Sequence, residues 1–186
     1  ALTPMQEGML FYYLKEPARD WPLYLEQLGL EIRGEIDPGL FEKAWNFTIE
    51  TNEMLRALFR WEKVEKPIQI ILKEHRLQPD YYDLTGEDPL EIKKRLQEIK
   101  NLDRKKGFDL RKAEVPFRVA LCKIEKEKYV MIIANHHILY DGWSTGIILK
   151  EFIGAYTDFF NKKEPLKPLK IKFKEFIRGN RRQDKQ

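Results

Sequence analysis

The sequence predicts an α+β fold in which helices pack against a mixed or mostly antiparallel sheet, as in an α/β sandwich. Apolar and polar residues alternate in several short segments, which is the pattern of half-buried strands. Between these segments, apolar residues recur every three or four positions, as they do along one face of a helix. Strand pairs that are mixed with helices favour a sheet covered by helices.

The chain is expected to begin with a helix. Thr3 is a good N-cap, Pro4 suits the first helical position, and Glu7 lies in the first turn, where the helix dipole favours a carboxylate. Met5 and Met9 recur at helical spacing, and we assign both to the core.

The next elements follow from alternation and from Asp-Pro start signals. Residues 23–33, "LYLEQLGLEIR", end in an alternating run and predict a strand. Asp37 and Pro38 open a second helix that ends near "TNE". Its apolar stripe consists of Phe41, Trp45, Thr48 and Ile49. "LRALFRWEK" and "PIQIILKE" then predict two strands joined as a hairpin.

The second half of the chain starts with a long, charged and exposed helix that opens at "EDP" and stops at Gly107. "PFRVALCKIE" and "KYVMIIANHHI" predict the two strongest strands, again a hairpin. The second has little polar alternation, so we expect a central strand covered on both faces. Asp141 or Ser144 can cap a helix that runs to about Phe160, and "IKFKEFIRGNRRQ" predicts a short terminal helix.

Composition limits the class of protein. A chain of 186 residues with 42% hydrophobic residues fits one domain with a sizeable core. The net charge of +4 comes from interleaved charges, and the basic end of the chain carries no nucleic-acid motif, so we expect no nucleic-acid partner. Without a membrane-length apolar run or a signal peptide, we expect a cytoplasmic protein. The single cysteine, Cys122, is expected to be a buried small hydrophobe.

The stretch "NHHILYDGWS", residues 135–144, holds two of the three histidines. Adjacent side chains in a strand point to opposite faces, so His136 and His137 should have different surroundings. A core histidine, a metal ligand and a general base are the three interpretations. The metal interpretation is weakest, because the remaining His75 lies far upstream without a ligand pattern.

The residues after the histidines leave alternatives open. Asp141 can orient His137, or it can turn inward to a buried arginine and shape the turn. Gly142 suits a position that needs either positive φ or room for a substrate. Ser144 is first of all an N-cap.

At this point the residues resemble a known family. "HHILYDGWS" is similar to the HHxxxDGxS signature of condensation domains from nonribosomal peptide synthetases, which share a core with chloramphenicol acetyltransferase. "LTPMQEGMLF", "NEMLRALF", "GFDLRKAEVPFR" and "FKEFIRGNRRQ" resemble further blocks of that family in the same order. The resemblance spans the whole chain and implies that residues 1–186 are the N-terminal lobe of a two-lobed domain. Both ends of the chain look cut rather than finished, which agrees with this expectation.

The resemblance also implies roles for individual residues. His137 is the active-site residue and His136 is more structural. Asp141 is held by a salt bridge to Arg56, and Gly142 lies near the entry of the acceptor amine. Trp143 and Ser144 are candidates for the substrate channel, and no metal is implied.

The implied reaction is peptide-bond formation between an acyl or peptidyl thioester and an aminoacyl group. Both are carried on 4'-phosphopantetheine arms of carrier proteins, and no cofactor is bound directly. The implied partners are donor and acceptor carrier proteins, the C-terminal lobe and an adenylation domain. The motifs favour a donor with a D-configured end, and the isolated lobe is expected to be inactive. The alternatives are a non-catalytic docking or scaffold module, or a relative of epimerisation domains.

Overall fold

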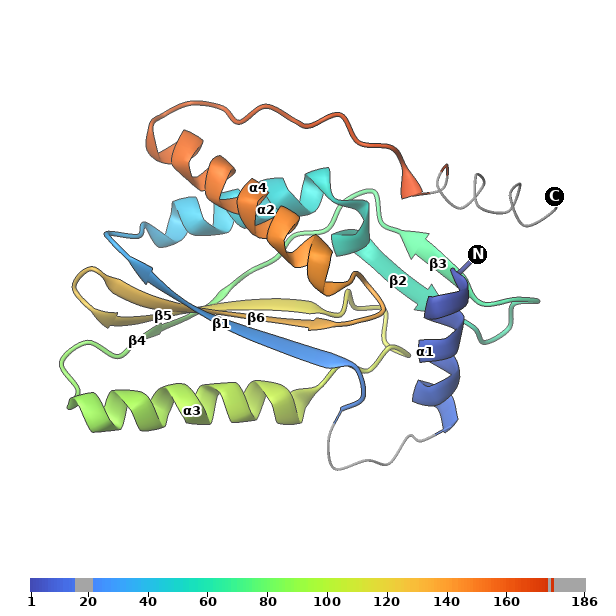
Figure 1. Cartoon of the computed structure of the whole chain (residues 1–186), viewed down its shortest axis with the longest axis horizontal. Helices are drawn as coiled ribbons and strands as arrows, with labels where there is room; N and C mark the ends of the chain where they lie inside the picture. The colour runs from blue at the N-terminus through green and yellow to red at the C-terminus, as the bar shows by residue number, and fades with distance from the viewer. Residues whose placement is uncertain (16–21, 174, 176–186) are drawn as a thin grey trace.

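The computed structural model describes residues 1–15, 22–173 and 175, and it confirms the α+β fold. A four-stranded sheet in the order β1-β6-β5-β4 lies between helices, and β2 and β3 form a separate two-stranded sheet (Figure 1). The elements are α1 (Pro4–Lys15), β1 (Leu25–Arg33), α2 (Pro38–Thr51), the 3-10 helix η1 (Glu53–Arg56), β2 (Ala57–Arg60), β3 (Ile68–Ile71), β4 (Asp80–Asp83), α3 (Pro89–Lys106), β5 (Phe117–Glu125), β6 (Lys128–His136) and α4 (Gly142–Phe160).

The main sheet is built around β6, which pairs antiparallel with β1 on one side and with β5 on the other. Most of its side chains are buried, which confirms the expectation of a central strand. At the far edge β4 pairs parallel with β5, so the sheet is mixed. The sequence did not predict β4, because "DYYD" has an acidic residue at each end and no apolar alternation.

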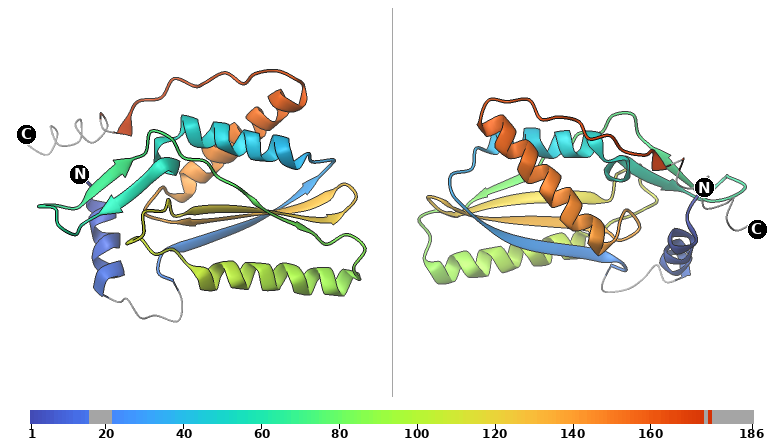
Figure 2. Two further views of the ribbon diagram at one scale, coloured as in Figure 1. Left: turned by 180° about the vertical axis from the view of Figure 1, so that it is seen from behind. Right: turned by 45° about the horizontal axis from the view of Figure 1, so that its top comes forward.

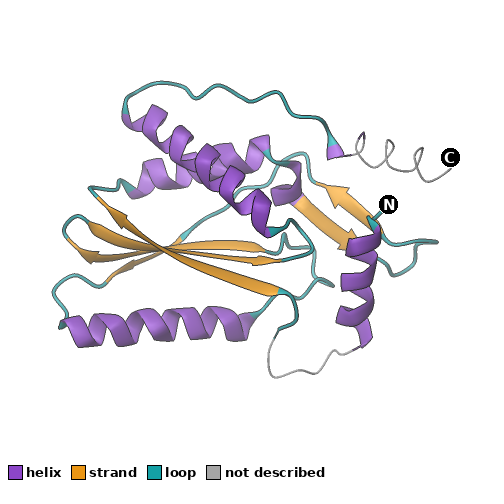
Figure 3. Cartoon of the chain, in the orientation of Figure 1, coloured by secondary structure: helices purple, strands orange, loops and turns teal. Residues whose placement is uncertain are grey.

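Helices cover both faces of this sheet (Figure 3). On one face lies α3, which starts after the N-cap Asp88 and ends at Gly107. The φ of Gly107 is 57°, in the left-handed region that favours glycine. Ile99 is its one buried residue, as expected for an exposed helix. The other face carries α2 and α4. Their contact centres on Trp45 and Phe152, whose rings stack 4.4 Å apart.

At one end of the sheet, α1 packs beside the β2–β3 hairpin (Figure 2). Thr3 and Gln6 form the cap of α1: the Gln6 N–H donates to the Thr3 hydroxyl, and the Thr3 N–H donates to the Gln6 side chain. Met9 is buried as expected, but the assignment of Met5 to the core is wrong, because Met5 is 66% exposed. Gln6, Met9 and Leu10 share the buried face of α1, and Met5 lies outside it.

Two further predictions concern the single cysteine and the end of the chain. Cys122 is fully buried, between the sheet and α3. The expected terminal helix lies mostly outside the described residues. In the described part of the chain, every helix is too short or too polar to cross a membrane.

Candidate active site

His136 ends β6 and points into the protein. Its side chain is 1% exposed, and the rings of Tyr13 and Tyr24 lie about it at centroid distances of 6.1 and 5.9 Å. Nδ1 accepts a hydrogen bond from the Ile138 N–H, so the proton of the neutral ring belongs on Nε2. Burial, and then the neighbouring His137, lower the pKa of His136 to about 4. The ring is therefore neutral at pH 7 and is part of the core.

His137 turns the other way, as the alternation of strand residues predicts. Its side chain is 29% exposed, and its backbone N–H donates to the Tyr24 carbonyl at 2.8 Å. The Nδ1 atom is shielded from solvent and lies 3.1 Å from Oε1 of Glu26. The two atoms are at ion-pair distance, but their angle is too poor for a hydrogen bond. Because Nδ1 is shielded, the nitrogen through which this side chain reaches solvent is Nε2.

Glu26 approaches His137 from β1, next to β6 in the sheet. It lies opposite Asn135 in the strand register, and the Asn135 amide donates to Glu26 Oε2 at 3.1 Å. The two oxygens of this carboxylate therefore face two different residues. Burial and the Glu26 charge also raise the pKa of the nearby Tyr140 phenol, which stays neutral.

Asp141 is the N-cap of α4 and lies exposed at the surface. Its Oδ1 accepts hydrogen bonds from the Ser144 N–H at 2.9 Å and from the Ser144 hydroxyl at 2.8 Å. These two donors hold the pKa of the Asp141 carboxyl below its usual value. Ser144 is therefore not the N-cap, but the residue that completes the cap.

The expected salt bridge between Asp141 and Arg56 is wrong, because both groups have other partners. The Arg56 guanidinium donates to four backbone carbonyls at the ends of α2 and β3, those of Ile49, Glu50, Leu72 and Lys73. Carbonyls at the end of a helix lack partners within the helix, so a cation there satisfies them. Asp141 instead has the N–H and the hydroxyl of Ser144, three residues away, as its partners.

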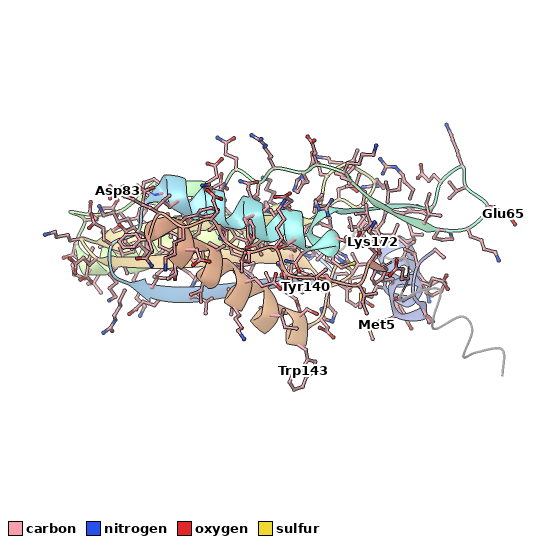
Figure 4. The ribbon with its side chains drawn as sticks, turned by 90° about the horizontal axis from the view of Figure 1, so that it is seen from above. Met5, Glu65, Asp83, Tyr140, Trp143 and Lys172 are labelled. Carbon is pink, nitrogen blue, oxygen red and sulfur yellow. The ribbon has the colours of Figure 1, made fainter. Side chains whose placement is uncertain are left out.

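The first residues of α4 face open space. Gly142 does not have positive φ, so the prediction that the turn needs this conformation is wrong. A Cβ at this position would meet nothing within 4 Å. Trp143 is 90% exposed, and Figure 4 shows its side chain pointing away from the body of the protein.

Several residues that support this turn were not predicted from the sequence. Gln6 is 6% exposed and donates its amide to the Ile138 carbonyl at 3.0 Å, so α1 holds the turn after β6. The spacing of Thr3 and Gln6 is that of a capping box, which could have drawn attention to Gln6. Glu26 and Asn135 become neighbours only through the strand register, which no local pattern reveals.

The arrangement places a partly exposed imidazole, backed by a carboxylate, beside an unobstructed helix start. Such an imidazole can accept a proton or donate a hydrogen bond near neutral pH. Within the described residues, no group of three or more His, Cys, Asp or Glu side chains could hold a metal ion.

Known proteins are similar to this chain in sequence, and solved structures are similar to it in fold. The family described as Condensation domain matches residues 1–186. The chain is 39% identical over 155 residues to bacitracin synthase 3 of Bacillus licheniformis and 32% identical over 189 residues to surfactin synthase subunit 3 of Bacillus subtilis. These matches cover 83% and 100% of this chain, but only 2% and 14% of the relatives.

Solved structures agree on the fold. A crystal structure of the starter condensation domain of the rhizomide synthetase has a TM-score of 0.84 at 20% identity, over 100% of this chain and 44% of that one. The first condensation domain of the calcium-dependent antibiotic synthetase has a TM-score of 0.79 at 19% identity, over 92% and 40%. The chain thus spans less than half of these structures. With the whole sequence matched, the chain belongs to the condensation domain family of nonribosomal peptide synthetases.

Proposed function

We propose that the chain is the N-terminal lobe of a condensation domain that forms peptide bonds. A second lobe completes the cleft over the exposed start of α4. The observation that carries the proposal is the geometry of His137, with Nδ1 shielded beside Glu26 and the other nitrogen open to solvent.

The substrates are two groups tethered through 4'-phosphopantetheine arms to carrier proteins, one an acyl or peptidyl thioester and the other an aminoacyl group. The α-amine of the acceptor attacks the thioester carbonyl, the new C–N bond forms, and the C–S bond breaks. One proton leaves the amine, and the departing thiolate takes up a proton. An amine with an ordinary pKa near 7.7–8.0 is mostly protonated at neutral pH, so proton removal and alignment are the tasks that remain.

His137 performs these tasks through Nε2, either as the base that takes the amine proton or as the group that positions the amine. The neighbouring residues have separate roles. His136 is a neutral core residue that anchors the end of β6, Asp141 starts α4, and Gly142 leaves room beside the backbone. Trp143 and Ser144 lie where the substrate channel would begin. Arg56 supports the scaffold by joining the ends of α2 and β3.

The proposed partners are a donor and an acceptor carrier protein, the C-terminal lobe and an adenylation domain of the same synthetase. The donor ends in a D-configured residue, a proposal based on the likeness of "LTPMQEGMLF" and "HHILYDGW" to that subtype. Donors with D- and L-configured ends, offered to the complete domain in equal amounts, test this subtype. A preference for the L-configured donor would contradict it.

The main experiment measures dipeptidyl product on carrier proteins by mass spectrometry, using the complete domain over a range of pH. His137→Ala and His137→Gln should each lower turnover about 10²-fold or more if the imidazole transfers the proton. A base gives a wild-type profile that falls at low pH, whereas a positioning role allows partial activity in His137→Gln. Wild-type turnover in His137→Ala would overturn both roles. Inversion of the donor residue without peptide-bond formation would instead indicate an epimerisation domain. No product at all from the complete domain would indicate a scaffold module.

A further inference from the structure

Glu26 and His137 face one another through atoms that lie 3.1 Å apart, although 111 positions separate them in the sequence. Glu26 belongs to the edge strand β1, and His137 follows the central strand β6. We propose that Glu26 is a positioning residue: its carboxylate keeps the His137 proton on Nδ1 and so leaves Nε2 free to accept a proton from the substrate. This inference rests on the proposed function and names the residue that orients its imidazole.

The chemistry of the two groups sets the direction of the contact. An ionised carboxylate only accepts hydrogen bonds, so the imidazole nitrogen that faces it must carry the hydrogen. The neutral ring has one N–H, and a proton on Nδ1 therefore makes Nε2 the acceptor. The Nδ1 and Oε1 atoms are already within hydrogen-bond distance, so only the angle separates the present ion-pair contact from a hydrogen bond.

The strand register holds Glu26 in place. Antiparallel pairing sets it opposite Asn135, so both side chains point to the same face of the sheet, the face that His137 also occupies two residues on. The Asn135 amide occupies Oε2 at 3.1 Å, which leaves Oε1 for the histidine. The His137 N–H bond to the Tyr24 carbonyl ties the two strands beyond the end of the ladder. Tyr24 accepts this bond with a φ of 57°, a conformation rarely adopted by residues other than glycine.

The other charged neighbours do not replace Glu26. Asp141 caps α4 instead, where its Oδ1 accepts both Ser144 bonds, and the ion pair of His137 among the described residues is with Glu26. His136 is neutral at pH 7, and Tyr140 lies beside Glu26 as a neutral phenol. Glu26 is the carboxylate in contact with the ring among the described residues.

The first test is kinetic and uses the complete condensation domain with carrier-bound substrates. Glu26→Gln keeps the size of the side chain, but the Asn135 donor retains the amide oxygen, so the new NH2 group faces Nδ1 and favours the wrong tautomer. Glu26→Ala removes the acceptor altogether. Both variants should lower kcat about 10²-fold with KM for the carrier proteins nearly unchanged. Glu31→Gln, on the same strand but in an exposed ion pair with Arg33, is the matched control and should keep wild-type kcat.

The second test reads the tautomer directly, by NMR of the complete domain labelled with ¹⁵N-histidine. His137 is assigned from the signals lost in His137→Gln. The wild type should show the proton on Nδ1, and both Glu26 variants should show it on Nε2. An unchanged tautomer would overturn the inference at any level of activity. A changed tautomer with unchanged kcat would overturn it too. Wild-type turnover in His137→Gln would overturn the proposed function instead, and the NMR result would still report whether Glu26 sets the tautomer.

Discussion

His136 makes the stability of the protein depend on pH. In the folded state burial lowers its pKa to about 4, whereas the unfolded chain has a value near 6.5. Between these values the unfolded state binds more protons, so stability is full above pH 6.5 and decreases as the pH falls towards 4. We expect the wild type to lose on the order of 3 kcal/mol over this window relative to His136→Gln. Urea unfolding at pH 7 and pH 4.5 measures the difference.

His75 needs a control, because burial, and then Arg56, also lower its pKa. Its contribution to the pH dependence of stability has the same sign as that of His136. The effect of His136→Gln is therefore also measured in a protein that carries His75→Gln. The free energy of unfolding is then compared between His75→Gln and the double variant His75→Gln/His136→Gln. If both change with pH in parallel, this would contradict a buried, neutral His136.

Asp141 contributes to stability as the N-cap of α4. Asp141→Ala removes the acceptor of both Ser144 bonds and should cost about 1 kcal/mol, whereas Asp141→Asn should be close to wild type. The folded state lowers the pKa of the carboxyl, so the stabilisation is present above a pH of about 3.9 and is lost as the pH falls through the lower, folded value. Thermal melting at pH 7 compares the three proteins. Equal loss in the Asn and Ala variants would show that the capping bond is not the cause.

Local rules predicted the histidines well and their partners poorly. Strand alternation alone implies that His136 and His137 face opposite sides, and the structure agrees. The partner predicted for Asp141 was wrong because a serine three residues away provides both donors in place of the distant arginine. Glu26 stayed hidden because its contact depends on which residue of β1 faces which residue of β6.

At the scale of elements, Arg56 fastens the end of α2 to the end of β3. Its guanidinium bridges carbonyls from both, so Arg56→Ala should destabilise the protein by about 2 kcal/mol. Because Arg56 and Asp141 share no contact, the effects of Arg56→Ala and Asp141→Ala should add within about 0.5 kcal/mol. Urea unfolding of the single and double variants measures this.

A coupling free energy above about 1 kcal/mol between Arg56→Ala and Asp141→Ala would support a salt bridge between the two residues after all. Arg33→Ala is the control for removing an arginine without such a role. Arg33 is 84% exposed and pairs with Glu31 at the surface, so its loss should change stability by less than about 1 kcal/mol.

Element boundaries were predictable where a cap or a breaker marks them. Asp37 and Asp88 each accept the N–H of a residue in the first turn of their helix, and Gly107 ends α3, as their positions in the sequence indicated. The strand β4 carries no such signal. It forms because β5 offers an edge to pair with, and this is a property of the assembled sheet rather than of the four residues.

At the scale of the whole molecule, one core joins the two sheets. Leu58 and Phe59 of the small sheet belong to the same buried cluster as Met131 of β6 and Phe152 of α4. A second cluster, which includes Cys122, lies between the main sheet and α3. Since the strands of the main sheet line both clusters, loss of either should open the other, and the protein should unfold in one cooperative step.

Cys122 offers a direct test of that cooperativity. It is the single cysteine, it is fully buried, and burial raises the pKa of its thiol to about 11, so a thiol reagent reaches it only when the sheet opens. Phe59→Ala, in the other sheet, should cost about 3 kcal/mol and raise the labelling rate on the order of 100-fold. Phe11→Ala, at a position 59% exposed, should leave the rate unchanged. If Phe59→Ala lowers the unfolding midpoint seen by circular dichroism but not the protection of Cys122, the small sheet unfolds on its own. Equal free-energy changes from the two measurements would instead mean that the hairpin and the main sheet unfold together.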